Sequence, residues 1–365
     1  MIMRKILFVA PYPEGLAPSQ RLKYEQYYPY FREAGYEITT RSFIDAEFWQ
    51  TVYKPGNTFR KILFTIKAYF RRIKDLFTLG KYDVVYVHLW VTPIGPPLFE
   101  WLFRKFSKRL IYDIDDLIFL KPKSKSNPLI NWLKSSNKSI YLMKVADHVI
   151  TCTPHLDQFV RQFNNKTTDI SSTINTIAYR PRKDYSVKEK ITLGWSGSHS
   201  TSKYVYLLNN VFLKLKEEID FRLLVIGDRE FKMEGIEVIA IPWQESTEVD
   251  DLAKIDIGLY PLPDEEWVLG KSGLKALQYM ALGIPTIATA IGANYRVIES
   301  GVSGFLVNSP EEWLQAIRDL AKNEALRVSI GSKAAERVEQ FYSLNANAPV
   351  YLRILDKVIS NEVNS

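Results

Sequence analysis

The chain alternates short apolar runs with stretches of helical periodicity, and it does so in both halves. The apolar runs read as buried strands at 6–10, 82–90, 109–115 and 147–153, then at 191–195, 221–227, 237–241, 256–261, 285–289 and 304–307. Continuous apolar strands separated by helices are typical of a parallel sheet covered on both faces. The fold class we predict is α/β, with two Rossmann-like, doubly wound parallel sheets.

Helical patterns fill most of the intervals between these runs. They lie near 19–34, 59–77, 97–107 and 128–145, then 203–217, 246–253, 272–282 and 310–322, with a last one at about 345–360. A chain of 365 residues is too long for one ordinary core and predicts about two domains. The polar segment "YRPRKDYSVKEK" (179–190) is the best linker, so we place the domains at 1–180 and 181–345. Ligands of such sheets bind beyond the carboxyl ends of the strands, and we expect the two domains to face one another across a cleft.

Cysteine content and hydropathy bear on where the protein works. The single cysteine, Cys152, rules out an internal disulfide and fits a reducing compartment. No apolar run reaches the length of about 18 residues that a membrane span requires. The start "MIMRKILFVAPYP" reads as a first strand and lacks the features of a signal peptide. We expect a cytoplasmic protein that rests on the inner face of the cell membrane.

Charge is distributed unequally along the chain. Residues 1–180 contain 27 Lys and Arg against 15 Asp and Glu, which gives +12, whereas 181–365 contain 21 against 26, which gives −5. The basic first half indicates an anionic partner. In 59–77, Ile62, Ile66, Tyr69, Phe70, Ile73 and Phe77 form one helical stripe with basic residues largely beside it, and 98–110 is similar. Such a stripe suits an anionic membrane surface, but it equally suits packing on the sheet with a solvated basic side.

The stretch "GKSGLKALQYMALG" (270–283) reads as a turn that opens into a helix. A helix start leaves backbone N–H groups unpaired and carries a partial positive charge, so it suits an anion. We predict that a diphosphate binds the N–H groups of Ser272, Gly273 and Leu274, with Lys271 and Lys275 as charge partners. A capped surface helix with solvated lysines is the alternative.

The whole stretch from Gly270 to Val307 resembles the nucleotide-sugar-binding segment of family 4 glycosyltransferases, which have the GT-B fold. The resemblance includes a small-residue helix, Gly-x-Pro at 283–285, a strand and a glycine turn before "GFLV". It extends more weakly over the first strand with its loop, the "VVYVH" strand end and the last helix. It implies that 346–365 form a helix that crosses back to the first domain.

The sequence departs from the family pattern at several donor positions. Gly270 and Gln278 occupy the positions of the family's two glutamates, the second of which binds the ribose hydroxyls; Gln278 keeps that capacity because an amide both donates and accepts. Asp264 is a candidate to replace the first glutamate. Trp195 stands where the family often has an arginine, so charge neutralisation shifts to Lys271 and Lys275.

The loop "GWSGSHSTSK" (194–203) follows the first strand of the second domain. There the N–H groups of Ser196, Gly197 and Ser198 are candidates to hold the phosphate or the donor sugar. An ordinary strand-to-helix turn is the alternative.

In the first domain, His88 ends the strand "DVVYVH". Its position aims the ring at the cleft, where the resemblance implies contact with the donor sugar; a structural histidine is the alternative. Asp115 and Asp116 in "YDIDDLIF" (112–119) are candidates for binding acceptor hydroxyls or organising the loop, with a helix cap as the alternative. Asp113-x-Asp115 also spells the metal motif of the other large glycosyltransferase fold, a reading that the two-domain rhythm disfavours.

The first strand-to-helix loop, "PYPEGLAPSQRLKYEQ" (11–26), supplies the acceptor candidates Gly15 and Arg21. Gly15 gives the loop freedom. Arg21 lies in the first turn of the expected helix, where it opposes the helix dipole, which favours use against an anion such as an acceptor phosphate.

Together these features predict a glycosyltransferase that moves a sugar from a UDP-sugar, with a GDP-sugar second, to a glycan or lipid-linked saccharide. The resemblance implies retention of configuration, no cofactor and no metal, in cell-surface polysaccharide biosynthesis. Two alternatives remain: a nucleotide-sugar epimerase on the same fold, and a non-catalytic basic protein that binds membrane or nucleic acid. The sequence contains no RNA-recognition motif and no pattern of aromatic residues on which bases could stack, so we expect no nucleic-acid partner.

Overall fold

The computed structural model describes residues 3–52, 54, 56–117, 137–187 and 189–360. Contacts divide the chain into two compact units, unit 1 (1–171 with 347–365) and unit 2 (172–346). The first part (128–136) of the candidate helix at 128–145 and the end (118–119) of the 112–119 segment lie outside the described residues.

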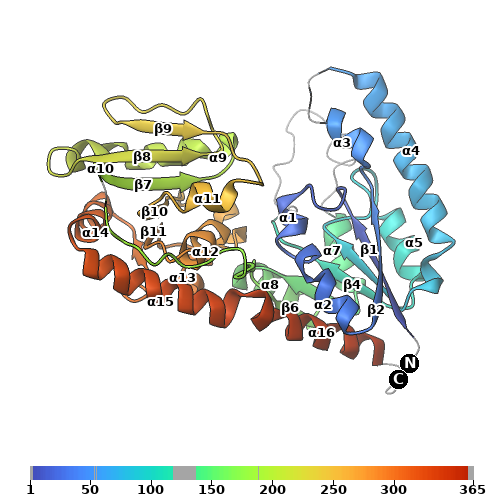
Figure 1. Ribbon diagram of the computed structural model, residues 1–365. Helices are drawn as coiled ribbons and strands as arrows, with labels where there is room; N and C mark the ends of the chain where they lie inside the picture. Colours follow the sequence, from blue (N-terminus) through green and yellow to red (C-terminus); the bar gives the residue numbers. More distant parts are fainter. Residues whose placement is uncertain (1–2, 53, 55, 118–136, 188, 361–365) are drawn as a thin grey trace. The chain divides into compact units, whose positions relative to one another are not determined.

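Unit 1 is built on a six-stranded sheet of order β2-β1-β3-β4-β5-β6 in which every pairing is parallel (Figure 1). Its strands are β1 (Arg4–Ala10), β2 (Tyr36–Ser42), β3 (Val84–His88), β4 (Leu110–Asp113), β5 (His148–Thr151) and β6 (Thr167–Asp169). Its helices are α1 (Pro18–Arg21), α2 (Tyr28–Glu33), α3 (Ala46–Val52), α4 (Thr58–Leu76), α5 (Leu98–Phe106), α7 (Asn137–Val145) and α8 (Pro154–Arg161).

Unit 2 repeats the architecture with the order β12-β11-β10-β7-β8-β9, again all parallel. Its strands are β7 (Ile191–Ser196), β8 (Phe221–Ile226), β9 (Val238–Ile241), β10 (Ile257–Tyr260), β11 (Thr286–Thr289) and β12 (Phe305–Val307). Its helices are α9 (His199–Ser202), α10 (Asn209–Leu215), α11 (Glu248–Leu252), α12 (Leu274–Ala281), α13 (Asn294–Val297), α14 (Pro310–Lys322) and α15 (Glu324–Tyr342); α16 (Leu344–Ser360) follows.

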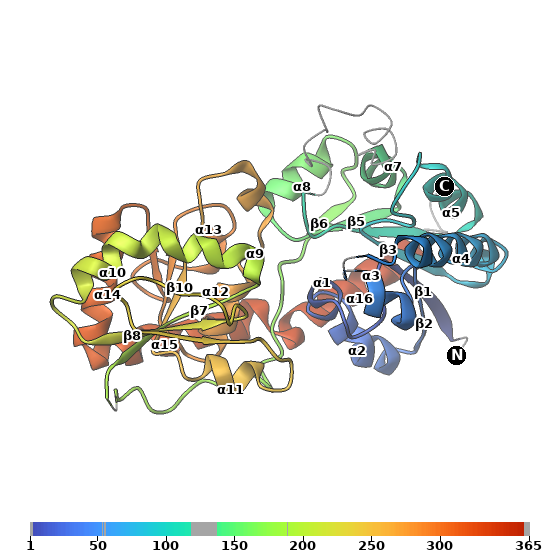
Figure 2. The ribbon, with the colours of Figure 1, turned by 90° about the horizontal axis from the view of Figure 1, so that it is seen from above.

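The two faces of the unit 2 sheet bury separate cores, because successive strand residues point to opposite faces. Leu224 and Ile226 of β8 join one core, whereas Leu223 and Val225 join the other. Around the sheet, α10 and α14 cover one face, and α12 and α15 the other (Figure 2). The predicted α/β class with two doubly wound parallel sheets is therefore confirmed.

The change from one unit to the other comes earlier than the predicted linker. Tyr179 and Tyr185 of that linker are buried, and Arg182 bonds the carbonyl oxygens of Ala253 and Ile255. These contacts hold residues 179–185 against the rest of unit 2, so the polar composition of the segment did not mark a free linker there. The division lies between Ser171 and Ser172.

Arg72 is the residue through which α4 is fixed to the carboxyl edge of the unit 1 sheet. Its guanidinium is buried and donates to the carbonyl oxygens of Ala10, Arg41 and Val91 at 3.0–3.2 Å, and to Asp75 at 3.1 Å. Those carbonyls end β1, belong to β2 and follow β3, so one side chain spans three strands. Burial lowers the pKa of Arg72 to about 10 despite the carboxylate of Asp75.

We expect Arg72→Leu to lower the free energy of unfolding by about 3 kcal/mol, because it removes one of the two cations paired with Asp75, leaving only Arg41, and takes the guanidinium donor from three backbone carbonyls. Urea denaturation measures the loss. Arg60→Leu, on the exposed side of the same helix, is the matched control and is expected to change stability by less than about 1 kcal/mol. Equal effects of the two substitutions would contradict this account of how α4 is held.

Candidate functional site

The helix that follows the lysine-rich turn, α12, starts directly after a glycine in the left-handed conformation. Gly273 has φ +79° and caps α12, and a Cβ there would meet Cγ2 of Val297 at 3.0 Å. Both the backbone conformation and the space therefore require glycine. The predicted helix start near 272 is confirmed to within two residues, and it lies beyond the carboxyl end of β10.

Lys275 lies where the strand order of unit 2 reverses. The chain enters the sheet at β7, then builds outward through β8 and β9 on one side and through β10 on the other. The Lys275 ammonium is 4.3 Å from the ring centroid of Trp195 on β7 and 5.8 Å from that of Tyr260 on β10. It thus lies at the junction where open α/β sheets bind their ligands.

The electrostatics of Lys275 favour an anion. Burial, together with the charge of Lys271, lowers its pKa to about 7. Gly197 leaves the space for this ammonium, since a Cβ at Gly197 would be 2.3 Å from Nζ. Lys271 stands over the ring of Trp267 at 5.5 Å. A desolvated cation beside a second cation is a common signature of a binding site for phosphate-like groups.

The loop after β7 uses two of its three predicted phosphate donors inside the protein. The N–H of Ser196 donates to the Tyr279 hydroxyl at 2.7 Å, and that of Gly197 donates to the Ile226 carbonyl at 2.9 Å. The prediction that these two N–H groups hold phosphate is therefore wrong. Ser198 is exposed and precedes α9.

Tyr279 was missed from sequence although a signal for it exists. A Cβ at Gly258, within β10, would lie 2.5 Å from the Tyr279 ring, so this strand glycine makes room for the ring. The hydroxyl then reaches Ser196, and burial raises the pKa of Tyr279 to about 12.

His199 and Asp228 also escaped the sequence reading. The His199 Nδ1 lies 3.0 Å from Oδ1 of Asp228, whose other oxygen accepts from Ser202 at 2.6 Å. The hydrogen bond and charge of Asp228 raise the pKa of the exposed His199. Asp228 therefore favours the protonated imidazole of His199, the first residue of α9, next to Ser198.

Gln278 lies in a buried hydrogen-bond cluster of unit 2. Its Nε2 donates to the Tyr179 hydroxyl at 3.0 Å and to Oε1 of Glu248 at 3.1 Å. Trp243 Nε1 donates to the same carboxylate at 2.8 Å. The amide nitrogen is thus engaged within the protein, and ribose binding by Gln278 stays a prediction that depends on its carbonyl oxygen.

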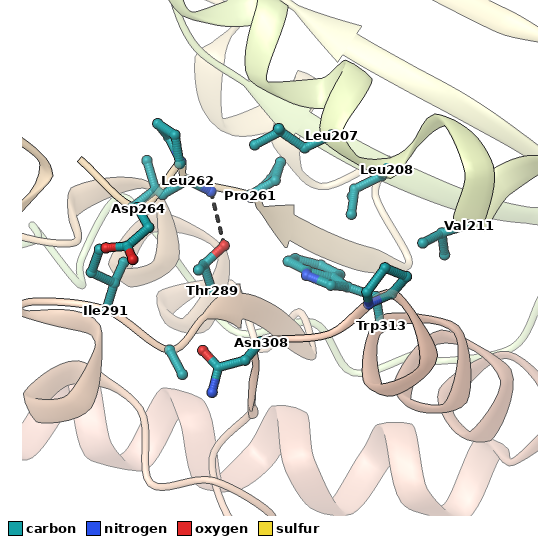
Figure 3. Close-up of a pocket in the computed structure, with 13 residues that line it drawn as sticks. Leu207, Leu208, Val211, Pro261, Leu262, Asp264, Thr289, Ile291, Asn308 and Trp313 are labelled. Atoms are coloured by element: carbon teal, nitrogen blue, oxygen red, sulfur yellow. Dashed lines mark hydrogen bonds between the residues drawn. The ribbon is translucent and has the colours of Figure 1, made fainter.

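A cavity of about 470 Å³ opens beside the carboxyl ends of β10 and β11 (Figure 3). Leu208, Leu262 and Trp313 are among its apolar lining residues, and Asp264, Thr289 and Asn308 are its polar ones. The Leu262 N–H donates to Oγ1 of Thr289 at 2.9 Å and fixes one wall. The predicted donor residue Asp264 therefore lies at a cavity large enough for part of a small molecule.

In unit 1, His88, which we predicted to point into the cleft, lies inside the unit instead. It is wholly buried, its ring packs 5.1 Å from that of Tyr24, and its Nδ1 is 3.6 Å from Oδ2 of Asp113. Lys23 lies 3.0 Å from Asp113, which also accepts from the Tyr86 hydroxyl at 2.6 Å. The strand end feeds a buried ionic cluster here, so the prediction that His88 reaches the cleft is wrong.

Asp113 and Asp115 experience opposite environments although they are two residues apart. Burial opposes ionisation of Asp113, but Lys23 and His88 hold its pKa below the usual range. Burial raises the pKa of Asp115 despite the same two partners. Asp116 is half-buried and accepts from the Leu117 N–H at 2.8 Å. Paired carboxyls with divergent pKa values suit acid–base roles.

In the part of the chain that the structure describes, no three His, Cys, Asp or Glu side chains lie close enough together to hold a metal ion. Asp113, half of the candidate metal motif, is paired with Lys23 instead. That the reaction needs no metal or cofactor stays a prediction.

The acceptor candidates lie on the loop between β1 and α1. Gly15 has φ +80°, and its N–H donates to Glu25 at 2.9 Å. Arg21 is the last residue of the short helix α1, so it complements the helix dipole and the prediction that it opposes a dipole is wrong. The expected helix near 19–34 is interrupted after Arg21 and resumes at Tyr28.

Comparison with known families identifies the second half of the chain. Residues 190–323 match the family model described as glycosyl transferases group 1, and this range includes Lys271, Lys275 and the cavity. This part of the chain is therefore similar to the glycosyl transferases group 1 family.

Two curated glycosyltransferase relatives illustrate the likeness. The chain is 38% identical over 71 residues to the D-inositol 3-phosphate glycosyltransferase of Paenarthrobacter aurescens, covering 19% of this chain and 17% of that protein. It is 31% identical over 176 residues to the N-acetyl-alpha-D-glucosaminyl L-malate synthase of Bacillus anthracis, covering 44% and 45%. The chain therefore spans less than half the length of each of these relatives.

Solved structures extend the likeness to the whole fold. The sucrose-phosphate synthase of Thermosynechococcus elongatus superposes with a TM-score of 0.70 at 15% identity, over 98% of this chain and 100% of that one. The HepE protein of Anabaena, solved in complex with UDP and glucose, gives 0.69 at 15% identity, over 97% and 100%. The fold is of the GT-B type.

The lowered pKa of Lys275 makes a prediction about stability. Below about pH 7 the Lys275 amine is protonated in both the folded and the unfolded chain, and the folded protein bears the full cost of desolvating that charge. Between pH 7 and the ordinary value of 10.5 only the unfolded chain binds it, so this group's contribution to the free energy of unfolding rises with pH.

We therefore expect Lys275→Met to raise the free energy of unfolding most below pH 7, with the gain shrinking toward pH 10.5. Urea denaturation across this range measures it. Lys333→Met, on the exposed side of α15, is the control and is expected to show no such trend. A pH-independent difference for Lys275→Met would show that its ammonium is not desolvated.

Proposed function

We propose that this protein transfers a sugar from a nucleotide diphosphate sugar to a saccharide acceptor. The observation that carries the proposal is the Lys275 ammonium, with its pKa of about 7, at the strand-order reversal of a group 1 glycosyltransferase domain. Among the described residues no carboxylate raises the pKa of the half-buried Lys275, so its ammonium gains from an incoming diphosphate. Lys271 and the start of α12 add to the same field.

In this mechanism the acceptor hydroxyl oxygen bonds to the anomeric carbon as the bond from that carbon to the diphosphate breaks. The hydroxyl proton passes to the released diphosphate, and the configuration at the anomeric carbon is retained. Lys271, Lys275 and the N–H groups of Ser272, Gly273 and Leu274 stabilise the charge on the leaving diphosphate without reorganising. Asp264 and the cavity beside it bind the donor sugar. No metal or cofactor takes part in this scheme.

UDP is the donor base that we favour, with GDP second. The Anabaena structure with UDP and glucose supports this choice through its shared fold. For the acceptor we propose a glycan or lipid-linked saccharide of cell-surface polysaccharide biosynthesis, bound by unit 1 with Gly15 and Arg21. The work would take place in the cytoplasm at the membrane, which fits the excess of basic residues in the first half of the chain.

A thermal-shift screen of UDP, GDP, ADP and their sugar conjugates tests donor binding. At about 100 times its dissociation constant the donor should stabilise the protein by about 2.7 kcal/mol, which is several degrees. We expect Lys271→Ala and Lys275→Met to lose most of the shift and Lys333→Ala to keep it. Because the bound diphosphate holds the proton on Lys275, affinity should fall as pH rises above 7. A shift that survives both lysine substitutions would place the diphosphate elsewhere.

Asp115→Asn tests the unit 1 side of the reaction. We expect the rate of donor turnover, followed as nucleotide diphosphate released from the best donor of the screen, to fall about 100-fold, because a carboxyl that positions the attacking hydroxyl of the acceptor or of water is lost. The thermal shift by the donor should not change, since Asp115 lies outside the donor-binding unit. Asp319→Asn, on the exposed side of α14, is the control. Undiminished turnover would remove Asp115 from the mechanism.

A further inference from the structure

Helix α4 presents its apolar stripe to solvent. Seven large apolar side chains recur at helical spacing along it and are exposed, up to 62% for Phe70 and 82% for Phe77: Phe59, Ile62, Leu63, Ile66, Phe70, Ile73 and Phe77. We call this set the α4 stripe. The sequence left open whether the stripe packs on the sheet; Tyr69 of the predicted stripe does pack inward, against Phe43, and the exposed residues exclude that reading for the rest.

The sheet-facing side of α4 is a different set of residues. Phe64, Ala68, Arg72 and Asp75 are buried, and Arg72 fixes the helix to three strands. The outward stripe is therefore not a consequence of a loosely placed helix. An ordinary surface helix turns its apolar residues to the core and its charges to water, and α4 does the reverse with one part of its surface.

The neighbouring helix α5 enlarges the exposed apolar area. Leu98, Trp101 and Phe106 are exposed on it, and α5 packs beside α4 through a ring contact of 5.5 Å between Tyr69 and Phe99 (Figures 1 and 2). Exposed apolar areas that continue over neighbouring elements mark interaction sites.

The charges on the two helices have one sign outside the core. Lys67 and Lys74 are exposed beside the α4 stripe, and the Lys105 ammonium lies 4.9 Å from the Trp101 ring on α5. The acidic residues of these helices, Asp75 and Glu100, are both buried. A second copy of the chain would bring like charges together, whereas an anionic lipid surface would meet opposite charge.

We propose that α4 and α5 dock unit 1 on an anionic lipid bilayer, with the α4 stripe in the headgroup and acyl boundary and the lysines at the phosphates. Interfacial helices with an apolar face and a basic flank bind membranes in this way. No described helix is both long enough and apolar enough to pass through a bilayer. Docking would bring unit 1 to lipid-linked saccharides, the acceptor class of the proposed function. Only this link to the acceptor rests on the proposed function.

Sedimentation with vesicles of phosphatidylcholine, alone or mixed with phosphatidylglycerol, tests the docking. We expect binding to the anionic vesicles only, weakened at least tenfold by Phe70→Asp. The pair Lys67→Glu and Lys74→Glu should weaken it at least 25-fold, about fivefold for each lost charge. Phe341→Asp, at a phenylalanine 51% exposed on α15, is the matched control and should bind as the wild type does.

Three results would overturn the proposal: no binding to anionic vesicles, equal loss with Phe341→Asp, or a concentration-dependent dimer in light scattering that Phe70→Asp abolishes. The donor thermal shift, measured on the same variants, separates this proposal from the proposed function. Phe70→Asp should keep the shift by the nucleotide, and Lys275→Met should keep vesicle binding. If the wild type shows only one of the two activities, the proposal for the missing activity is refuted and the other stands.

Discussion

All described strand pairings are parallel, and this constraint decides where polar groups gather in both units. Parallel strands bring all their carboxyl ends to one edge, and the reversal of strand order leaves a gap there. Unit 1 fills this edge with its own charges, since Arg72 spans β1 to β3 and the Lys23–Asp113 pair lies at β4. In unit 2 the corresponding place holds the Lys275 ammonium between two aromatic rings.

The buried Arg72 and the half-buried Lys275 differ in their partners, and the difference has a physical meaning. Arg72 has a carboxylate and three carbonyl oxygens, so its charge is satisfied within the fold. The pKa of Lys275 is governed by burial and by a second lysine. A fold that holds such a group gives up stability in the empty state, and an anionic ligand restores it. The Lys275 side chain thus lowers the stability of the empty protein and favours anion binding, whereas the Arg72 side chain serves the stability of the fold.

Periodicity predicted most of the fold, and its failures have local causes. The strand β2 was missed because "YEITTRS" is half-exposed and polar, without the apolar run of a central strand. At the site, the lysine-rich turn was predictable because glycine, helix start and charge coincide within a few residues. The occupation of the Ser196 and Gly197 N–H groups was not, because their acceptors, Tyr279 and Ile226, are distant in sequence. The burial of His88 likewise depends on Tyr24 and Lys23, which the chain brings in from another element.

Helix α4 shows a further limit of sequence patterns. Its stripe was visible in the sequence, but amphipathicity gives the angle between apolar and polar residues on a helix and not the direction in which the helix is fixed. That direction is set by Arg72, three of whose hydrogen bonds join α4 to the strand ends, together with Phe64 and Ala68, which pack on the same side of the helix. Once those bonds form, the stripe on the opposite side can only point outward. The same buried arginine that completes the unit 1 sheet therefore determines that an apolar and basic surface is offered to an external partner.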